Sequence, residues 1–329
     1  MPVTIKDVAA VLGISPSTVS RAFGRPEKVD EQTRRRIMAA ADELGYRPNL
    51  AARALNTGRT QCIGAILPDL ENPFFAGVLK GIEAAGEALG YQTLVADSEE
   101  HPDAERRAAA VLAPQVDGLV LCSSRLEDDD LLKINAQRRV VLVNRTVDGL
   151  PHVSFDSQAG MSEAVRHLVA LGHRRIGYTG APLESRSARV RLAAFIEATA
   201  ASAVDGRVLG EFPPTFEGGG AAADAALTAD ITAVVVYNDI MAIGLTHRLL
   251  SYGLELPQRL SVVGCDNVPI AAMITPSLTT VDLPRIQAGR MAAELLHAIL
   301  SNEGPVEEYP LLEARLVVRQ STAAPFGPA

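Results

Sequence analysis

The sequence predicts an α/β protein in which an all-α helix-turn-helix segment precedes two doubly wound lobes, each a parallel sheet covered by helices. Two helical patterns separated by a three-residue turn stand near the N-terminus. From about residue 61 apolar runs alternate with helical stretches, and this alternation starts again near residue 158. A chain of 329 residues, 47% of them hydrophobic, is long enough for more than one core. Together these observations favour three folded parts.

The helix-turn-helix segment is predicted from the signals that start and stop its helices. Apolar residues at helical spacing over 5–12 are followed by Gly13, a residue type that commonly ends a helix. Ser15 is a good N-cap, and Pro16 suits the first position of a second helix. A third apolar helical pattern covers about 31–44. Three short helices in this order form either a DNA-binding unit or a plain three-helix bundle.

Charge favours the DNA-binding unit over the plain bundle. The second helix carries Ser17, Ser20 and Arg21 but no acidic residue, so this face can enter a major groove. Residues 1–60 hold ten Lys and Arg against six Asp and Glu, a net charge of +4, whereas the remainder carries −12. A basic end on an acidic body directs that end to phosphate.

Cysteine usage and the hydropathy pattern indicate an intracellular protein. Cys62, Cys122 and Cys265 lie far apart in apolar runs, which is typical of buried thiols in a reducing compartment. The N-terminus lacks the layout of a signal peptide, and no stretch approaches the ~20 apolar residues of a membrane span. We expect a cytoplasmic protein with no membrane contact, metal or cofactor.

The body is predicted from two sets of apolar strands. The first set comprises CIGAIL, QTLVA, DGLVLC and VVLVN, with helices near 75–89 and 103–113. The second comprises RRIGYTG, TAVVVYN and LSVVGC, with helices near 158–171, 188–201 and 239–252. Such alternation predicts parallel sheets with helices on both faces. Two lobes of this kind place the carboxyl ends of their strands around a shared cleft, where ligands bind.

Polar and aromatic residues that follow these strands are the candidate ligand site. Each polar one could instead cap a helix or make a turn, but their recurrence at one edge of the sheets favours a ligand role. A sugar, with hydroxyl groups around a partly apolar ring, would suit this mixture of side chains. The candidates are Asn72, Phe74, Phe75, Asn144, Arg145, Asp156, Asn238, Asp239 and Asp266.

Two stretches, TIKDVAAVLGISPSTVSRAF and ELGYRPNLAARAL, resemble the DNA-binding headpiece of the LacI/GalR family of bacterial transcription regulators. The body resembles that family's effector domain, which has the fold of periplasmic sugar-binding proteins. The resemblance implies a repressor that binds a pseudo-palindromic operator in double-stranded DNA as a homodimer, under control of a small effector such as a sugar. It also adds Arg189, Arg191 and Phe216 to the candidates for effector binding.

The same resemblance assigns residues to DNA. The bases would be read by Pro16, Ser17 and Arg21, with Arg21 able to contact guanine through two hydrogen bonds. A hinge helix would insert Leu55 into the minor groove with Ala51, Ala52 and Arg53 beside it, although a plain linker helix is the alternative. Phosphate contacts would come from Thr18, Ser20, Thr33, Arg34 and Asn49.

Two other functions, an α/β enzyme and a sugar-binding transport component, fit the body alone. The sequence has no G-x-G-x-x-G, G-x-x-x-x-G-K-[ST] or G-x-S-x-G motif, which argues against the enzyme. The DNA-reading segment argues against the transport component. A nucleobase or sugar acid stays open as the effector, and so does a tetramer. The expected domains are 1–46, the hinge 47–60, a first lobe of 61–157 with about 284–318, and a second of 158–283 with about 319–329.

Overall fold

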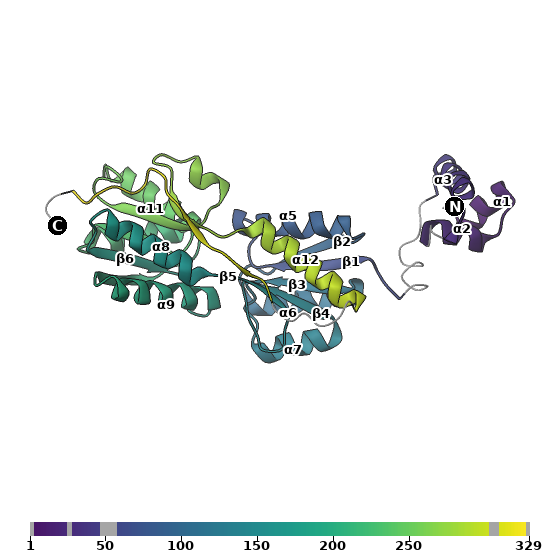
Figure 1. Cartoon of the computed structure of the whole chain (residues 1–329), viewed down its shortest axis with the longest axis horizontal. Helices are drawn as coiled ribbons and strands as arrows, with labels where there is room; N and C mark the ends of the chain where they lie inside the picture. The colour runs from purple at the N-terminus through teal and green to yellow at the C-terminus, as the bar shows by residue number, and fades with distance from the viewer. Residues whose placement is uncertain (1–2, 25–27, 47–57, 303–308, 327–329) are drawn as a thin grey trace. The chain divides into compact units, whose positions relative to one another are not determined.

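The computed structural model describes residues 3–24, 28–46, 58–302 and 309–326. The chain divides into two compact units, Met1–Gln61 and Cys62–Ala329, and each has its own hydrophobic core. The first unit is the helical headpiece and the second is the α/β body (Figure 1). No helix in these ranges is long and apolar enough to cross a membrane.

The headpiece has three helices with the predicted bounds, α1 (Ile5–Leu12), α2 (Pro16–Gly24) and α3 (Glu31–Leu44). Local capping explains the agreement. Thr4 and Asp7 form a capping box at the start of α1, and the Asp30 carboxylate accepts hydrogen bonds from two backbone N–H groups of α3. Gly13 and Gly45 end helices in the left-handed conformation, with φ of 65° and 67°.

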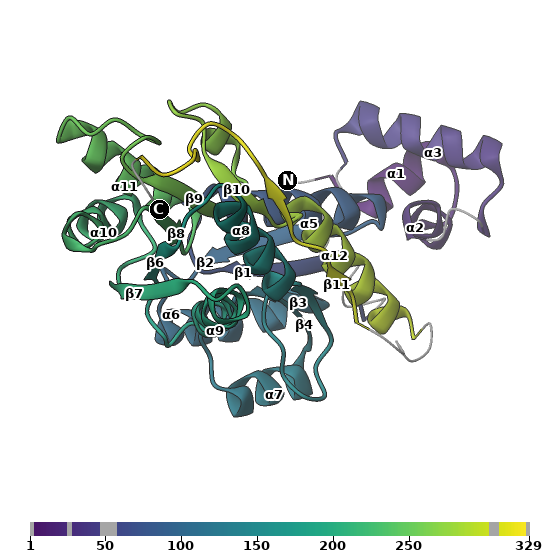
Figure 2. The same cartoon turned by 60° about the vertical axis from the view of Figure 1, so that its left-hand side comes forward.

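The first lobe of the body is a six-stranded parallel sheet in the order β11-β5-β4-β3-β1-β2. Helices α5 and α12 cover one face, and α6 and α7 cover the other (Figures 1 and 2). Because both faces are covered, β3 is buried along its whole length and β4 in all but its first residue. The elements are β1 (Cys62–Leu67), α5 (Pro73–Ala88), β2 (Gln92–Asp97), α6 (Pro102–Leu112), β3 (Gly118–Cys122), α7 (Asp128–Gln137), β4 (Arg139–Val143), β5 (His152–Phe155), α12 (Arg285–Ser301) and β11 (Leu311–Leu312).

The second lobe repeats this plan with the strand order β12-β10-β9-β8-β6-β7, in which only β12 runs antiparallel to its neighbour. Helices α8 and α9 pack on one face, and α10 and α11 pair on the other. The pattern of apolar runs did not predict β7, because this strand lies at the edge of the sheet and has four exposed residues and no buried one. The elements are α8 (Ser157–Ala170), β6 (Arg175–Gly180), α9 (Arg186–Ala201), β7 (Asp205–Glu211), α10 (Phe216–Thr228), β8 (Ala233–Val236), α11 (Asp239–Ser251), β9 (Ser261–Asp266), β10 (Thr279–Asp282) and β12 (Arg315–Val317).

The chain passes between the lobes three times, after β5, after β10 and after β11. The last crossing comes earlier than the expected residue 319, because β12 already pairs with β10 of the second sheet. The backbone N–H of Leu316 donates to Glu163 of α8 at 2.7 Å, which fixes the returning segment to the second lobe.

Candidate DNA-reading helix and effector cleft

The exposed face of helix α2 is polar and carries one basic residue and no acidic one. Pro16, Ser17, Ser20 and Arg21 are exposed, whereas Thr18 is half-buried. The Ser15 hydroxyl caps the helix by accepting from the Thr18 N–H at 3.1 Å, as its position predicted. The hydroxyl groups along this turn can donate to DNA phosphates, and they can donate to or accept from base edges.

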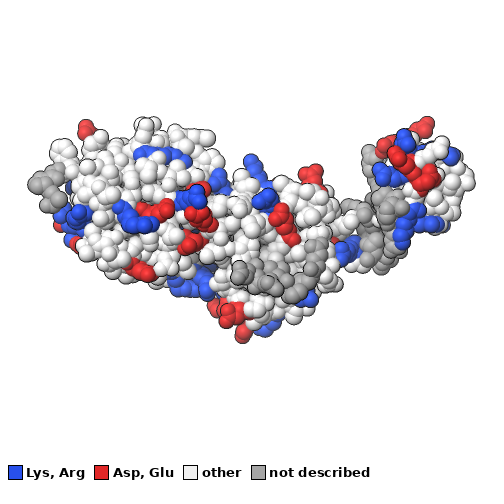
Figure 3. Space-filling view, viewed as in Figure 1, with Lys and Arg blue, Asp and Glu red and all other residues white. Residues whose placement is uncertain are grey.

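The side chain of Arg21 is oriented on this face by a hydrogen bond within the helix. Its Nε donates to the Ser17 carbonyl at 3.2 Å, and no carboxylate of the described headpiece forms an ion pair with it. The guanidinium therefore keeps donors available for guanine. On the face drawn in Figure 3, both basic and acidic side chains lie on the headpiece and on the body.

The other expected DNA contacts divide into two groups. Thr33 and Arg34 stand in the first turn of α3, where Thr33 is half-buried and Arg34 is exposed. The phosphate candidate Asn49 and the hinge candidates Ala51, Ala52, Arg53 and Leu55 lie outside the described residues.

A cleft between the lobes of the body brings together seven of the expected effector residues. It continues into a cavity of about 750 Å³, and the two share Glu100, Arg125 and Pro214 in their walls. The lining is supplied in both lobes by loops that follow strands and by the N-terminal parts of α5 and α9, at the edge of the sheets where the topology predicts a ligand. The seven residues are Asn72, Phe74, Phe75, Asn144, Arg191, Asn238 and Asp266.

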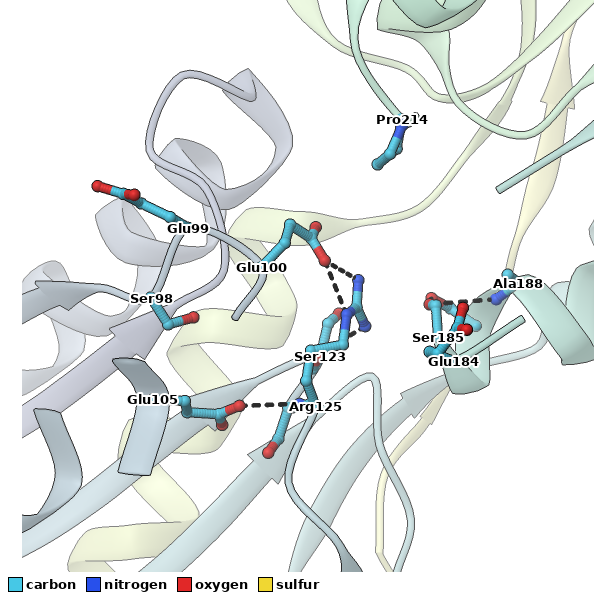
Figure 4. A network of polar contacts seen from close by, with 12 residues as sticks. Ser98, Glu99, Glu100, Glu105, Ser123, Arg125, Glu184, Ser185, Ala188 and Pro214 are labelled. Atoms are coloured by element: carbon cyan, nitrogen blue, oxygen red, sulfur yellow. Dashed lines mark hydrogen bonds and ion pairs between the residues drawn. The ribbon is translucent and has the colours of Figure 1, made fainter. Parts of the chain in front are cut away.

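On the first lobe an ion pair joins Arg125 to Glu100 (Figure 4). Nε of Arg125 donates to the Glu100 carboxylate at 2.7 Å, and its Nη1 donates to the Ser123 carbonyl at 2.9 Å. The backbone N–H of Arg125 is held by the buried Glu105 at 2.8 Å. Burial raises the pKa of Glu100, while the charge of Arg125 acts against the rise. Arg125 is therefore fixed at both its backbone and its side chain.

On the second lobe a more deeply buried ion pair joins Arg191 to Asp266. Nη2 of Arg191 donates to Asp266 Oδ1 at 3.0 Å, and the two side chains are 4% and 5% exposed. The guanidinium also donates to the Tyr237 carbonyl at 2.5 Å and lies 4.7 Å above the Tyr237 ring. Burial raises the pKa of Asp266 to about 6, against the influence of Arg191.

Three asparagines line the cleft and also do local structural work. Asn72 Oδ1 accepts from the Phe74 N–H at 3.0 Å, and Asn238 Oδ1 accepts from the Met241 N–H at 2.8 Å. Asn144 has a φ of 58° and donates to the Ser123 hydroxyl at 2.9 Å. Asn72 and Asn238 therefore cap helices and line the cleft at the same time, so the two roles do not exclude each other.

Five expected residues lie away from the inner cleft. Arg145 and Arg189 line only the adjoining cavity, where Arg145 pairs with Asp128 at 2.5 Å. Asp156 caps α8 by accepting from the Ala159 N–H at 2.9 Å, and it lines neither cavity.

Phe216 and Asp239 complete that group. Phe216 begins α10, is 40% exposed and contacts the His247 ring, so it forms no wall of the cleft. Asp239 is fully buried beneath the cleft, where it accepts from the Thr280 hydroxyl at 2.5 Å and the Val268 N–H at 2.8 Å.

Six further residues line the cleft and were not expected from the sequence. Ser123 and Tyr237 directly follow β3 and β8, so the rule that identified their neighbours could have found them. Glu100 precedes α6 in a loop rich in acidic residues, where nothing in the sequence distinguishes it from its neighbours. The six are Glu100, Ser123, Arg125, Ser187, Pro214 and Tyr237.

Comparison with known families identifies both units. Residues 4–49 match the model for bacterial regulatory proteins of the lacI family, and residues 165–322 match a periplasmic binding protein-like domain. The transcriptional repressor CytR of Escherichia coli K12 is 33% identical over 98% of this chain and 96% of its own. The regulator GalR of the same strain is 32% identical with the same coverage.

Solved structures agree with the family comparison. A Lac repressor dimer bound to operator and the anti-inducer ONPF superposes with a TM-score of 0.87 at 29% identity, over 98% of this chain and all of that one. The regulator CelR in complex with cellobiose superposes with a TM-score of 0.71 at 29% identity, over 97% of this chain and all of that one. The chain belongs to the lacI family of bacterial regulatory proteins and is a DNA-binding transcription regulator, not an enzyme.

Proposed function

We propose that the effector is an uncharged, polyhydroxylated molecule, a sugar or sugar derivative, bound in the cleft between the lobes. The observation that carries the proposal is the charge balance of the inner cleft. Each of its two guanidinium groups is already paired with a carboxylate, Arg125 with Glu100 and Arg191 with Asp266. A carboxylate or phosphate ligand would have to compete with these pairs, and burying it unpaired would be costly.

The remaining groups suit hydroxyls and an apolar ring face. Phe74, Phe75 and Tyr237 supply aromatic surface, and their rings are largely buried by the cleft walls. Three asparagine amides and two ion pairs line the same cleft, so neighbouring hydroxyls could donate to one group and accept from another. The bound cellobiose of CelR and the bound ribose of an Enterococcus faecium relative, which is 27% identical, support the same class.

Paired sugars of equal shape and different charge test this proposal. We expect D-ribose or D-galactose, or another neutral sugar of a broader panel, to raise the melting temperature of the full-length protein. The matched ribose 5-phosphate or galacturonate should have a smaller effect. Stabilisation by the anionic member alone would overturn the proposal.

For DNA we propose that two headpieces of a homodimer read a pseudo-palindromic operator in the cytoplasm. Arg21 would make the main base contact with Pro16 and Ser17 beside it, while Thr18, Ser20, Thr33 and Arg34 would contact phosphates. The operator-bound Lac repressor dimer supports this arrangement. Asn49 and the hinge candidates Ala51, Ala52, Arg53 and Leu55 stay a prediction from the sequence.

Enrichment of random DNA duplexes on the full-length protein tests the operator proposal. A symmetric consensus with two half-sites is expected. Equal binding of all sequences would contradict it.

A further inference from the structure

The backbone is strained where β9 ends at the cleft. Asp266 has a φ of 116° and Asn267 a φ of 50°, and both lie in a region that favours glycine. Asp266 is the cleft residue that pairs with Arg191. Two successive residues in this conformation persist only where their surroundings hold them.

Asn267 is fixed by hydrogen bonds at its backbone N–H, its backbone carbonyl and both polar atoms of its side chain. Its N–H donates to the Thr280 hydroxyl at 3.3 Å, and its Nδ2 donates to Asp282 at 2.9 Å. Its Oδ1 accepts from Arg319 at 2.6 Å, and its carbonyl accepts from Arg285 at 2.8 Å. Asp282 and Arg285 flank the second crossing between the lobes, and Arg319 follows the third, so the corner is tied to the crossings themselves.

Among these four partners of Asn267, Arg285 is the one that belongs to the first lobe. It is the first residue of α12, which packs along α5. A Cβ at Gly77 of α5 would lie 2.4 Å from Arg285 Cδ, so the arginine stem lies directly against that glycine. Helix α5 in turn begins with Phe74 and Phe75, which line the cleft from the first lobe.

The two helices are joined closely enough to transmit a displacement. A Cβ at Gly81 would lie 2.0 Å from the Ile286 carbonyl oxygen, and one at Gly289 would lie 1.9 Å from the Val78 carbonyl oxygen. Only backbone approaching backbone leaves so little room, so α5 and α12 move together. Figures 1 and 2 show them side by side along the sheet.

We propose that Arg285 is a positioning residue that links the strained Asp266–Asn267 corner of the second lobe to α5 of the first. A change at Asp266 then displaces the phenylalanines on the opposite side of the cleft, and the reverse holds as well. The role of this link in sensing rests on the proposed effector site, but the link itself does not. The guanidinium contributes its charge to the same corner, where it acts with Arg191 against the rise in the pKa of Asp266.

Three substitutions separate the hydrogen bond from the packing. Arg285→Met keeps an apolar stem over Gly77 but cannot donate to the Asn267 carbonyl. Arg285→Lys keeps a donor. Nε of Arg285 is buried with no hydrogen-bond partner in the described chain, which is unfavourable. Removing this donor in Arg285→Met therefore offsets part of the expected fall in melting temperature. Arg290→Met is the control, because Arg290 lies on the same helix but is 58% exposed.

Hydrogen exchange of the full-length protein without any sugar provides the readout. For Arg285→Met we expect about tenfold faster exchange both at 267–271 and at the start of α5, over 74–78. Arg285→Lys should restore most of the protection, and Arg290→Met should match the parent. Unchanged exchange at either segment in Arg285→Met, or faster exchange confined to the first turn of α12, would overturn the proposal. The sugar screen can fail without affecting this result.

Discussion

The buried pair of Arg191 and Asp266 should respond asymmetrically to the removal of either partner. Both side chains are at least nine-tenths buried, so water screens neither charge. Removing one member of such a pair typically costs about 3–5 kcal/mol, because the other charge stays buried and unpaired. The two residues differ in how they can escape that cost.

Arg191→Met leaves a carboxyl that can take up a proton. Burial already raises the pKa of Asp266 to about 6 with the arginine present, so its pKa should rise above neutral without it. Protonation then limits the loss to about 3 kcal/mol at pH 7, and the deficit should shrink as the pH falls to 5. Asp266→Asn instead leaves a guanidinium that cannot lose its proton, so we expect a loss nearer 4–5 kcal/mol, about the upper end of the range.

Urea unfolding followed by circular dichroism measures these losses, since the chain has no tryptophan to report by fluorescence. The double variant carries neither charge, so its loss should be smaller than the sum of the single losses by about 2 kcal/mol or more. Losses that add within about 0.5 kcal/mol would refute the reasoning, because they would mean that the two side chains do not interact. A larger loss for Arg191→Met than for Asp266→Asn at pH 7 would refute the protonation argument.

Three further outcomes are expected. Burial raises the pKa of Asp239 to about 8, so its contribution to stability is present near pH 4 and lost as the pH rises through 8. The melting temperature measured from pH 5 to 8.5 should therefore depend less on pH for Asp239→Asn than for the parent. Gly289→Ala should lower stability by more than about 3 kcal/mol through its clash with Val78, while Gly220→Ala, with open space around it, should raise stability by up to about 1 kcal/mol in the same urea titration. Arg21→Ala should lose base preference in duplex selection, yet reduce the salt dependence of binding by no more than about one counterion.

Local signals predicted the headpiece fully, whereas the cleft depends on contacts that the sequence does not display. Thr4, Gly13 and Asp30 act within a few residues of the helix ends that they fix, so the helix bounds could be read directly. In the body, the structure places two of the polar residues expected after strands, Asn72 and Asn238, in the wall of the cleft. Asp156 instead caps α8 through the Ala159 N–H, and Asp239 is buried, where it accepts from the Thr280 hydroxyl and the Val268 N–H.

The net charge of the body does not describe the charge of its cleft. A body of −12 would suggest a cationic effector if its charges acted together. The mixed surface in Figure 3 shows that they are dispersed, and within the inner cleft Glu100 and Asp266 are each neutralised by an arginine. Those pairings join residues 25 and 75 positions apart, so they appear only once the chain is folded. The charge balance of the cleft therefore follows from how its charges are paired and not from how many the chain carries.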